Sequence, residues 1–394
     1  MLSEKDGTMV WPRVIGQDRV KKLLLTSMHG NRLAHAYLFV GNEGVGKDAV
    51  ALELAAVLHC ERNADEACHE CPSCIKVDSM QHPDVRFIVA LPVGKSEKAD
   101  DPPLEKLAAS EVQLVQEELK TKARNPYHRV TIPRATIIKI NSIREIRRES
   151  ALSTYSRRRR VIIISRADEM GEAAANTLLK TLEEPSGDTM LILTTAHRNA
   201  LLPTILSRCQ VVTFDPLTEG EIRAALIGRN AVPAPQATLV ARLAHGSYAQ
   251  AIELLQEDMA ARRQQVLTFV RSVLGNNVTA ITDAVEELCS GKDRDPVIGF
   301  LNMMLMWIRD ALVLLRGGEV INQDQQDDIR RFVSKFPAGD LIGALDDVEQ
   351  AISLVERNVY INLVLLQLAV RLRRRILPHV QERQTGPPVT HKNR

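Results

Sequence analysis

Short apolar runs alternate with helical patterns along the first half of the chain. The runs have the length and composition of buried strands, and they lie at 36–40, 85–90, 161–165, 190–194 and 211–214. Between them apolar residues recur at helical spacing, for example in 49–58 and 173–183. Strands and helices that alternate in this way form a parallel sheet covered by helices, so we predict an α/β domain.

The pattern becomes purely helical after residue 215. Thr218 and Glu221 have the spacing of a capping box, which marks a helix start and a domain boundary. From Thr218 onward we find helical periodicity and no convincing strand, with Gly246 and the pair Gly317-Gly318 as helix stops.

These patterns divide the chain into three domains and a tail. We predict a sheet domain at 1–215, a small helical lid at 216–258 and an all-helical collar at 259–380. Residues 381–394 are polar, contain two prolines and are expected to be disordered.

Segment 91–134 interrupts the alternation of strands and helices. It carries Pro92, Pro102 and Pro103, dense charge and one amphipathic stretch at 104–123. We interpret it as an insertion on the sheet domain.

A helix is expected to follow the insertion. Ser142 and Glu145 have capping-box spacing and would begin a helix that runs into the arginines at 157–160. These arginines would suit nucleic-acid phosphates. Charged residues directly before a buried strand more often lie in solvent and hinder aggregation of that strand, and we favour this interpretation.

Composition narrows the class of protein. The chain has 394 residues, 45% of them apolar, which is enough for two or three cores. Lys and Arg number 51 and Asp and Glu 49, which excludes a strongly basic nucleic-acid binder. We find no signal-peptide pattern and no uninterrupted apolar stretch long enough to span a bilayer, so we expect a cytoplasmic protein.

A glycine-rich turn follows the first predicted strand and has the spacing of a P-loop. Gly41, Gly44 and Gly46 would let backbone N–H groups surround phosphates, and Lys47 would neutralise the outer ones. The next position normally holds a Ser or Thr that binds magnesium, but here it is Asp48. A tight turn that binds no nucleotide therefore remains an equal alternative.

Four of the six cysteines are clustered. They are Cys60, Cys68, Cys71 and Cys74, and the last three are separated by two residues each. This spacing lets thiolates reach one tetrahedral ion, which predicts a closed, structural Zn²⁺ site. His59 or His69 could replace one thiolate, but four sulfur ligands are favoured. We interpret Cys209 and Cys289 as ordinary buried thiols.

Several motifs occur in the order of one protein family. They are Ile15-Gly16-Gln17, His35-Ala36-Tyr37-Leu38-Phe39, the clustered cysteines, His82-Pro83-Asp84, the stretch 173–185 and the stretch 204–209. Over nearly its whole length the chain resembles the delta-prime family of bacterial DNA polymerase III clamp-loader subunits, which are AAA+ proteins. The insertion at 91–134 is longer than this resemblance leads us to expect.

The resemblance also shows what the chain lacks. In relatives that hydrolyse ATP, the strand before helix 173–183 ends in an Asp-Glu pair that holds magnesium, and here Ser165 and Arg166 stand there. Asp168 and Glu169 lie three residues further on and should point elsewhere. Ala249 stands where the sensor-2 arginine of the lid is usual. We therefore expect no ATP hydrolysis.

One catalytic position is retained. The resemblance implies that Arg208 is an arginine finger, which acts on the nucleotide of a neighbouring subunit. The alternative is that Arg208 only pairs with an acidic residue of its own domain. Glu183 and Glu184 are expected near the subunit interface.

The function implied is DNA replication. The chain would be a rigid, non-hydrolysing subunit of a hetero-pentamer with delta and gamma/tau subunits, which loads the sliding clamp onto primed DNA. One alternative is an active ATPase subunit of the gamma class. A second is a zinc-dependent interaction module with a vestigial nucleotide fold.

Overall fold

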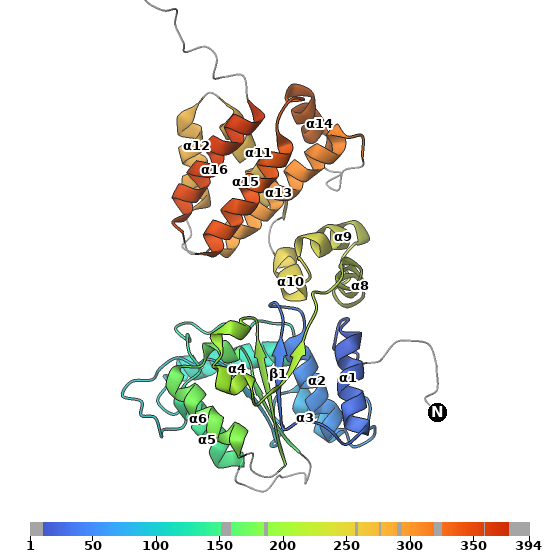
Figure 1. The fold of residues 1–394 in the computed structure, drawn as a ribbon, viewed down its shortest axis with the longest axis vertical. Helices are drawn as coiled ribbons and strands as arrows, with labels where there is room; N and C mark the ends of the chain where they lie inside the picture. The colour runs from blue at the N-terminus through green and yellow to red at the C-terminus, as the bar shows by residue number, and fades with distance from the viewer. Residues whose placement is uncertain are drawn as a thin grey trace, which may run out of the picture. The chain divides into compact units, whose positions relative to one another are not determined.

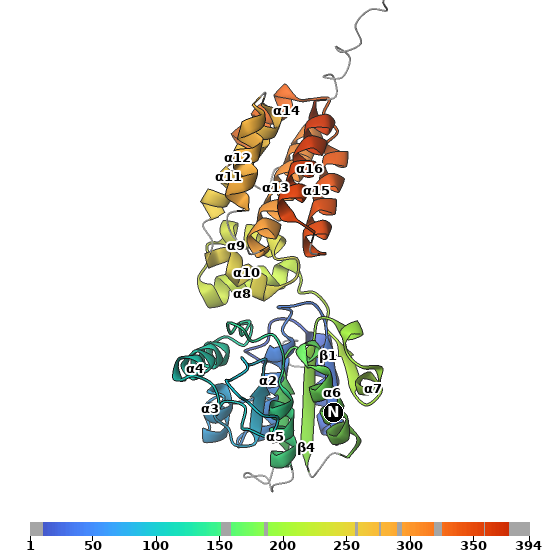
Figure 2. The same cartoon turned by 90° about the vertical axis from the view of Figure 1, so that its left-hand side faces the viewer.

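The computed structural model describes residues 11–150, 159–184, 188–256, 259–275, 277–289, 294–318, 325–357 and 359–377. The chain divides into two compact units, Met1–Glu253 and Leu254–Arg394. Figures 1 and 2 show a sheet with its helices in the first unit and helices alone in the described part of the second. The predicted tail at 381–394 lies outside the described residues.

Five parallel strands form the sheet of the first unit. They are β1 Ala36–Val40, β2 Val85–Ile88, β3 Arg160–Ile164, β4 Thr189–Thr195 and β5 Gln210–Thr213. Their spatial order is β2-β3-β4-β1-β5, which is the order of an AAA+ P-loop domain. The central strands β3 and β4 are buried along their whole length, as expected for a parallel sheet covered on both faces. The predicted fold class is confirmed.

Helices precede, connect and follow the strands. They are α1 Asp18–His29, α2 Lys47–His59, α3 Pro72–Asp78, α4 Ala109–Arg124, α5 Ile140–Ser150, α6 Glu172–Glu183 and α7 Pro203–Leu206, with short 3₁₀ turns at Ala167–Glu169 and Arg198–Ala200. Figure 1 shows α1, α2 and α3 on one side of the sheet and α5 and α6 on the other. Buried side chains of α5 and α6, including Ile143, Ile146 and Leu178, pack with β3 and β4 in one apolar core.

One predicted helix start is wrong, and one predicted amphipathic stretch is only partly helical. Helix α4 of the insertion covers Ala109–Arg124, whereas residues 104–106 at the start of the predicted stretch form a turn. Helix α5 begins at Ile140, so Ser142 lies inside it and not at its N-terminus. The Ser142 hydroxyl is buried without a hydrogen-bond partner, so it caps nothing. Burial of Ile143 and Ile146 against the sheet therefore outweighs the local capping signature.

The predicted capping box at Thr218 is confirmed. It begins α8 Glu219–Asn230, the first of three helices in the segment predicted as the lid. The other two are α9 Ala234–Leu243 and α10 Tyr248–Gln256. The Glu221 N–H donates to Thr218 Oγ1 at 3.2 Å, and the Thr218 N–H donates to the Glu221 carboxylate at 2.7 Å. The backbone reverses at Gly246, where φ is +83°, before α10 begins.

Replacing the cap should weaken the lid measurably. We expect Thr218→Ala to lower the free energy of unfolding of the first unit by about 1 kcal/mol, because it leaves a helix-terminal N–H without its acceptor. Urea unfolding followed by circular dichroism measures this. Thr238→Ala, within α9, is the matched control and should not destabilise. Equal curves for wild type and Thr218→Ala would contradict the assigned cap.

The described residues of the second unit form helices joined by turns, with no strand among them. Its helices are α11 Met259–Leu274, α12 Val278–Leu288, α13 Asp295–Leu315, α14 Gln326–Lys335, α15 Leu341–Glu356 and α16 Ile361–Ile376. Phe300 and Trp307 of α13 make edge-on ring contacts with Phe269 and Phe332. By length and composition α13 is the one described helix apolar enough to cross a membrane, which the sequence prediction did not anticipate. Its buried rings belong to the core of this unit, which accounts for that composition.

Candidate functional site

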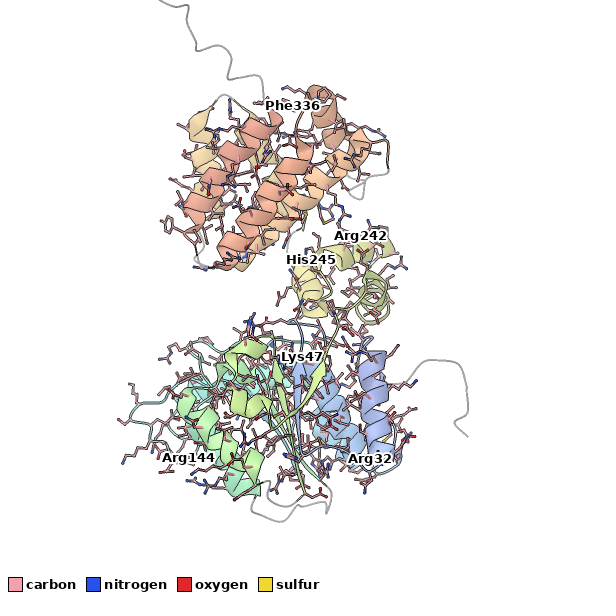
Figure 3. The ribbon with its side chains drawn as sticks, viewed as in Figure 1. Arg32, Lys47, Arg144, Arg242, His245 and Phe336 are labelled. Atoms are coloured by element: carbon pink, nitrogen blue, oxygen red, sulfur yellow. The ribbon has the colours of Figure 1, made fainter. Side chains whose placement is uncertain are left out.

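The glycine turn has the backbone of a P-loop. It joins β1 to α2, and Gly44 and Gly46 have φ of +73° and +104°, which favour glycine. Lys47, labelled in Figure 3, lies at the start of α2. Its ammonium donates to the carbonyl oxygens of Gly41 and Asn42, each at 2.6 Å, and burial lowers its pKa. The Lys47 ammonium therefore binds the backbone of its own loop in this structure.

Asp48 is the centre of a compact polar cluster. Its Oδ2 accepts from Lys122 Nζ at 2.7 Å and from Ser165 Oγ at 2.9 Å, and its Oδ1 accepts from Thr194 Oγ1 at 2.8 Å. Burial alone would raise the pKa of Asp48, but Lys122 and the two hydroxyls together hold it below the ordinary value. The carboxylate is therefore ionised and fully engaged by protein groups.

Two of these four residues were not foreseen. Ser165 directly follows β3, which ends at Ile164, and its hydroxyl donates to Asp48, as the position counted from the sequence leads us to expect. Thr194 comes from β4 and Lys122 from α4 of the insertion, and neither was predicted to reach the loop. Thr194 was detectable in principle because the carboxyl ends of parallel strands share one edge. Nothing in the sequence distinguishes Lys122 from the exposed Lys120.

The acidic residues after β3 point to other partners. Asp168 accepts from Thr195 Oγ1 at 2.7 Å, and Glu169 pairs with Arg166 at 2.9 Å. The expectation that Asp168 and Glu169 lie past the strand end is met, since both belong to the 3₁₀ turn Ala167–Glu169. Their partners in the described part of the chain are thus Thr195 and Arg166. Arg166 also donates to the Val130 carbonyl of the insertion at 2.8 Å.

The start of α10 lies directly on the P-loop. The Tyr248 N–H donates to the Gly44 carbonyl at 3.1 Å, and a Cβ on Gly44 would lie 2.8 Å from the Ala249 Cβ. The position that usually carries the sensor-2 arginine thus faces the loop, but its alanine side chain holds no charge. This placement supports the sequence comparison at residue 249.

The four clustered cysteines converge as predicted. The Sγ atoms of Cys60, Cys68, Cys71 and Cys74 all lie within 4.8 Å of one another. A tetrahedral zinc ion with Zn–S bonds of about 2.3 Å needs sulfur atoms roughly 3.8 Å apart, so the arrangement fits such an ion. Cys60 follows α2, and Cys71 caps α3 by accepting the Cys74 N–H at 3.4 Å. Burial opposes ionisation of Cys60, but backbone hydrogen bonds led by that of Arg62 lower its pKa to about 6.

The histidines near the cluster do not join it. His69 bonds to Asp78 at 2.9 Å and Glu53 at 3.1 Å, and these hydrogen bonds raise its pKa to about 10. The His59 ring lies 4.2 Å from the His82 ring, centroid to centroid. The favoured set of four sulfur atoms is therefore the one that the structure brings together. Of the other thiols, Cys209 is buried as predicted, whereas Cys289 is only half-buried.

Arg208 pairs within its own domain in this structure. Its guanidinium lies 2.7 Å from Glu183 Oε1, and it donates to the Thr204 carbonyl at 3.0 Å. The Arg208 and Glu183 side chains are 35% and 49% exposed. An exposed pair contributes only about 0–1 kcal/mol, so the guanidinium can exchange this partner for another at small cost.

The arginine run before β3 is only partly described, since residues 157 and 158 lie outside the described residues, as does Pro185 of the family motif. Arg159 pairs with Asp188 at 2.8 Å. Arg160 is buried and lies 3.8 Å from Asp84, so it is not the solvated residue that we favoured. Arg160 is therefore held inside the domain, whereas Arg159 has a partly exposed ion pair at the surface.

The sheet order, the glycine turn and the contact of α10 with the loop define a P-loop protein of the AAA+ class. Residues 16–218 match the family described as DNA polymerase III, delta subunit, and residues 256–374 match the family of its C-terminal part. Together with the delta' relatives described next, these matches show that the chain belongs to the DNA polymerase III delta-prime family of clamp-loader subunits.

Individual relatives agree with this assignment. The chain is 32% identical over 321 residues to DNA polymerase III subunit delta' of Bacillus subtilis, covering 80% of this chain and 83% of the relative. It is 31% identical over 250 residues to subunit delta' of Pseudomonas aeruginosa, covering 63% of each. Subunit tau of Bacillus subtilis is 27% identical over 290 residues, covering 71% of this chain and 42% of the relative.

Proposed function

We propose that the chain is a non-hydrolysing subunit of a bacterial clamp loader. It assembles with delta and gamma/tau subunits into a hetero-pentamer that places a sliding clamp on primed DNA. The observation that carries the proposal is the hydrogen bond between Ser165 and Asp48, because it joins the two positions that would otherwise hold magnesium. Membership of the family argues against an interaction module unrelated to the polymerase.

Arg208 is the group that acts on a partner. A fixed guanidinium stabilises the charge that develops on transferred phosphate, and a finger supplied in trans raises the rate of phosphoryl transfer by about 10³ or more. Its weak, exposed pairing with Glu183 leaves it available to a neighbouring subunit. We therefore assign Arg208 as a finger that serves the ATP of the adjacent ATPase subunit.

The cysteine cluster and the exposed apolar side chains of α16 are assigned structural roles. The four cysteines would hold Zn²⁺ with no open position, and the ion would tie the end of α2 to α3. On α16 the apolar side chains of Leu363, Leu366 and Val370 are exposed, whereas Leu368 and Leu372 are buried. We assign the exposed set to contacts between collars of neighbouring subunits.

The loader reconstituted with its cognate subunits tests the finger. We expect Arg208→Ala to lower the clamp- and DNA-stimulated ATPase rate severalfold, whereas Lys47→Ala leaves it unchanged because this loop turns over no ATP. Arg198→Ala, which removes another exposed arginine, is the matched control. The isolated chain should release no phosphate.

A further variant separates the finger from a structural pair. Glu183→Gln removes the charge that Arg208 pairs with in its own domain but keeps the guanidinium. We expect it to retain the wild-type rate. If Glu183→Gln slows the complex as much as Arg208→Ala does, Arg208 acts through its intradomain pair and is not a finger.

The similarity to subunit tau favours one other candidate, an ATP-hydrolysing subunit of the gamma/tau class. That candidate requires Asp48, Asp168 or Glu169 to bind magnesium. The Asp48 carboxylate is already engaged by Lys122, Ser165 and Thr194, and Asp168 and Glu169 bond to Thr195 and Arg166. ATP turnover by the isolated chain that is abolished by Lys47→Ala would establish this alternative.

A further inference from the structure

A lysine ammonium lies among the side chains that stand at the magnesium positions of the P-loop. Lys122 Nζ is 2.7 Å from Asp48 Oδ2, and the same oxygen accepts from Ser165. Thr194 bonds to the other carboxylate oxygen. In active P-loop enzymes the residue after the loop lysine and the end of this neighbouring strand hold the divalent cation. In the described structure Lys122 forms the ion pair with the Asp48 carboxylate, and Lys47 also lies near enough to interact with it electrostatically.

The groups around Lys122 are ones that stabilise a cation. Its side chain is only 4% exposed, so it is held where an unpaired ammonium would be strongly unfavourable. Besides Asp48, it donates to the His128 carbonyl at 2.8 Å and lies 5.7 Å from the centre of the Phe87 ring. A carboxylate, a carbonyl oxygen and an aromatic face are all groups that stabilise a cation.

The insertion touches the loop at a second point five residues further on. The Tyr127 hydroxyl accepts the Ile15 N–H at 2.7 Å, and a Cβ on Gly46 would lie 2.9 Å from the same oxygen. The Tyr127 ring lies edge-on to Tyr248 of the lid, with 5.0 Å between centroids. Tyr127 thus packs between the loop, the segment before α1 and the lid. The insertion is a structural part of the P-loop and not a peripheral decoration.

We propose that Lys122 replaces the divalent cation of the nucleotide site, so that the insertion supplies a built-in positive charge and the loop takes up no magnesium. The balance of charge supports this: the ammonium neutralises Asp48, and an arriving Mg²⁺ would meet a fixed positive charge within hydrogen-bond distance of its ligands. The inference deepens the proposed lack of hydrolysis by naming the group responsible. The expected magnesium ligands do not fit an ion while Lys122 is in place.

Removing the ammonium should therefore create a metal site. We expect Lys122→Ala to bind Mn²⁺, used as a paramagnetic stand-in for Mg²⁺, about tenfold or more tightly than wild type, as changes around a metal site commonly do. Asp48, Ser165 and Thr194 would supply the oxygen ligands. The double variant Lys122→Ala with Asp48→Asn should lose the gain, and Lys120→Ala on the exposed face of α4 should show none. Electron paramagnetic resonance titration of free Mn²⁺ measures each.

A second test uses the wild-type full-length chain, so its result does not depend on whether a variant folds. Its affinity for a fluorescent ATP analogue should be the same with Mg²⁺ and in buffer to which no Mg²⁺ is added; no chelator is used, so that zinc stays bound to the cysteines. An affinity for the ATP analogue that rises about tenfold on adding Mg²⁺ would overturn the proposal. So would a folded Lys122→Ala variant whose affinity for Mn²⁺ equals that of Lys120→Ala.

These outcomes are independent of the finger. The Arg208→Ala measurement on the assembled loader can fail while the loop still excludes metal. Equally, the loop can bind Mg²⁺ without hydrolysis while Arg208 still serves a neighbour.

Discussion

Stripping zinc from the purified chain should unfold the segment between α2 and α3. Structural zinc binds with an apparent free energy of about 10 kcal/mol or more at neutral pH, which is as large as the whole stability of many domains. Few apolar contacts can replace it here, because the segment 61–70 between Cys60 and Cys71 has no helix or strand of its own. We expect metal-free protein to melt at a much lower temperature and to expose this segment to proteases.

The measurement combines metal content with stability. Wild type should carry one zinc ion per chain, determined by mass spectrometry, and chelation should lower the melting temperature in step with zinc loss. Cys74→Ser, which replaces a buried ligand, should reproduce the chelated state, whereas Cys289→Ser outside the cluster should keep both zinc and stability. Unchanged melting after confirmed removal of the metal would refute a structural role.

The second large effect is expected at a buried ion pair that anchors the insertion. Lys139 Nζ lies 2.6 Å from Glu97 Oε1, and the two side chains are only 6% and 5% exposed. The same ammonium donates to the carbonyl oxygens of Pro92 at 3.0 Å and Pro103 at 2.8 Å. Removing one partner of a buried pair leaves the other charge without compensation, so Lys139→Met should lower the free energy of unfolding by about 3–5 kcal/mol.

Urea unfolding at pH 7 measures this loss, with two comparisons. Lys106→Met removes a lysine that pairs with Glu105 at the surface and should leave stability unchanged. The double variant Lys139→Met with Glu97→Gln should be more stable than Lys139→Met alone, because no unpaired charge remains. If Lys139→Met and Lys106→Met unfold alike, the pair does not anchor the insertion.

The same pair predicts a dependence on pH. Burial raises the pKa of Glu97, but hydrogen bonds from Lys139, Gly94 and Asn141 outweigh burial and leave the folded-state pKa below the unfolded value of about 4.3. Its stabilisation is therefore present above pH 4.3 or so and is lost as the pH falls through the lower, folded-state pKa. Unfolding curves of wild type and Glu97→Gln should converge as the solution is acidified.

The sequence predicted those features whose causes are local. Buried parallel strands appear as continuous apolar runs, so all five were located to within two residues at either end. The cysteine cluster and the glycine turn could be predicted for a similar reason, because the spacing of residues close together in the sequence determines the geometry of each. Lys122 could not be found in this way, because its partner lies 74 positions away and its neighbours in α4 carry similar charges. The helix start at Ser142 was predicted wrongly, because burial of the next residue, Ile143, outweighs the local capping signature.

The Asp48 cluster also has a consequence for the kinetics of folding. Its three hydrogen bonds join residues 74, 117 and 146 positions apart, so each closes a long loop whose entropy must be lost before the contact forms. Proteins whose contacts join distant parts of the chain fold slowly for this reason. The cluster would therefore add to the time that the sheet domain needs to assemble, and the unfinished domain would leave Asp48 and Lys122 without each other as partners.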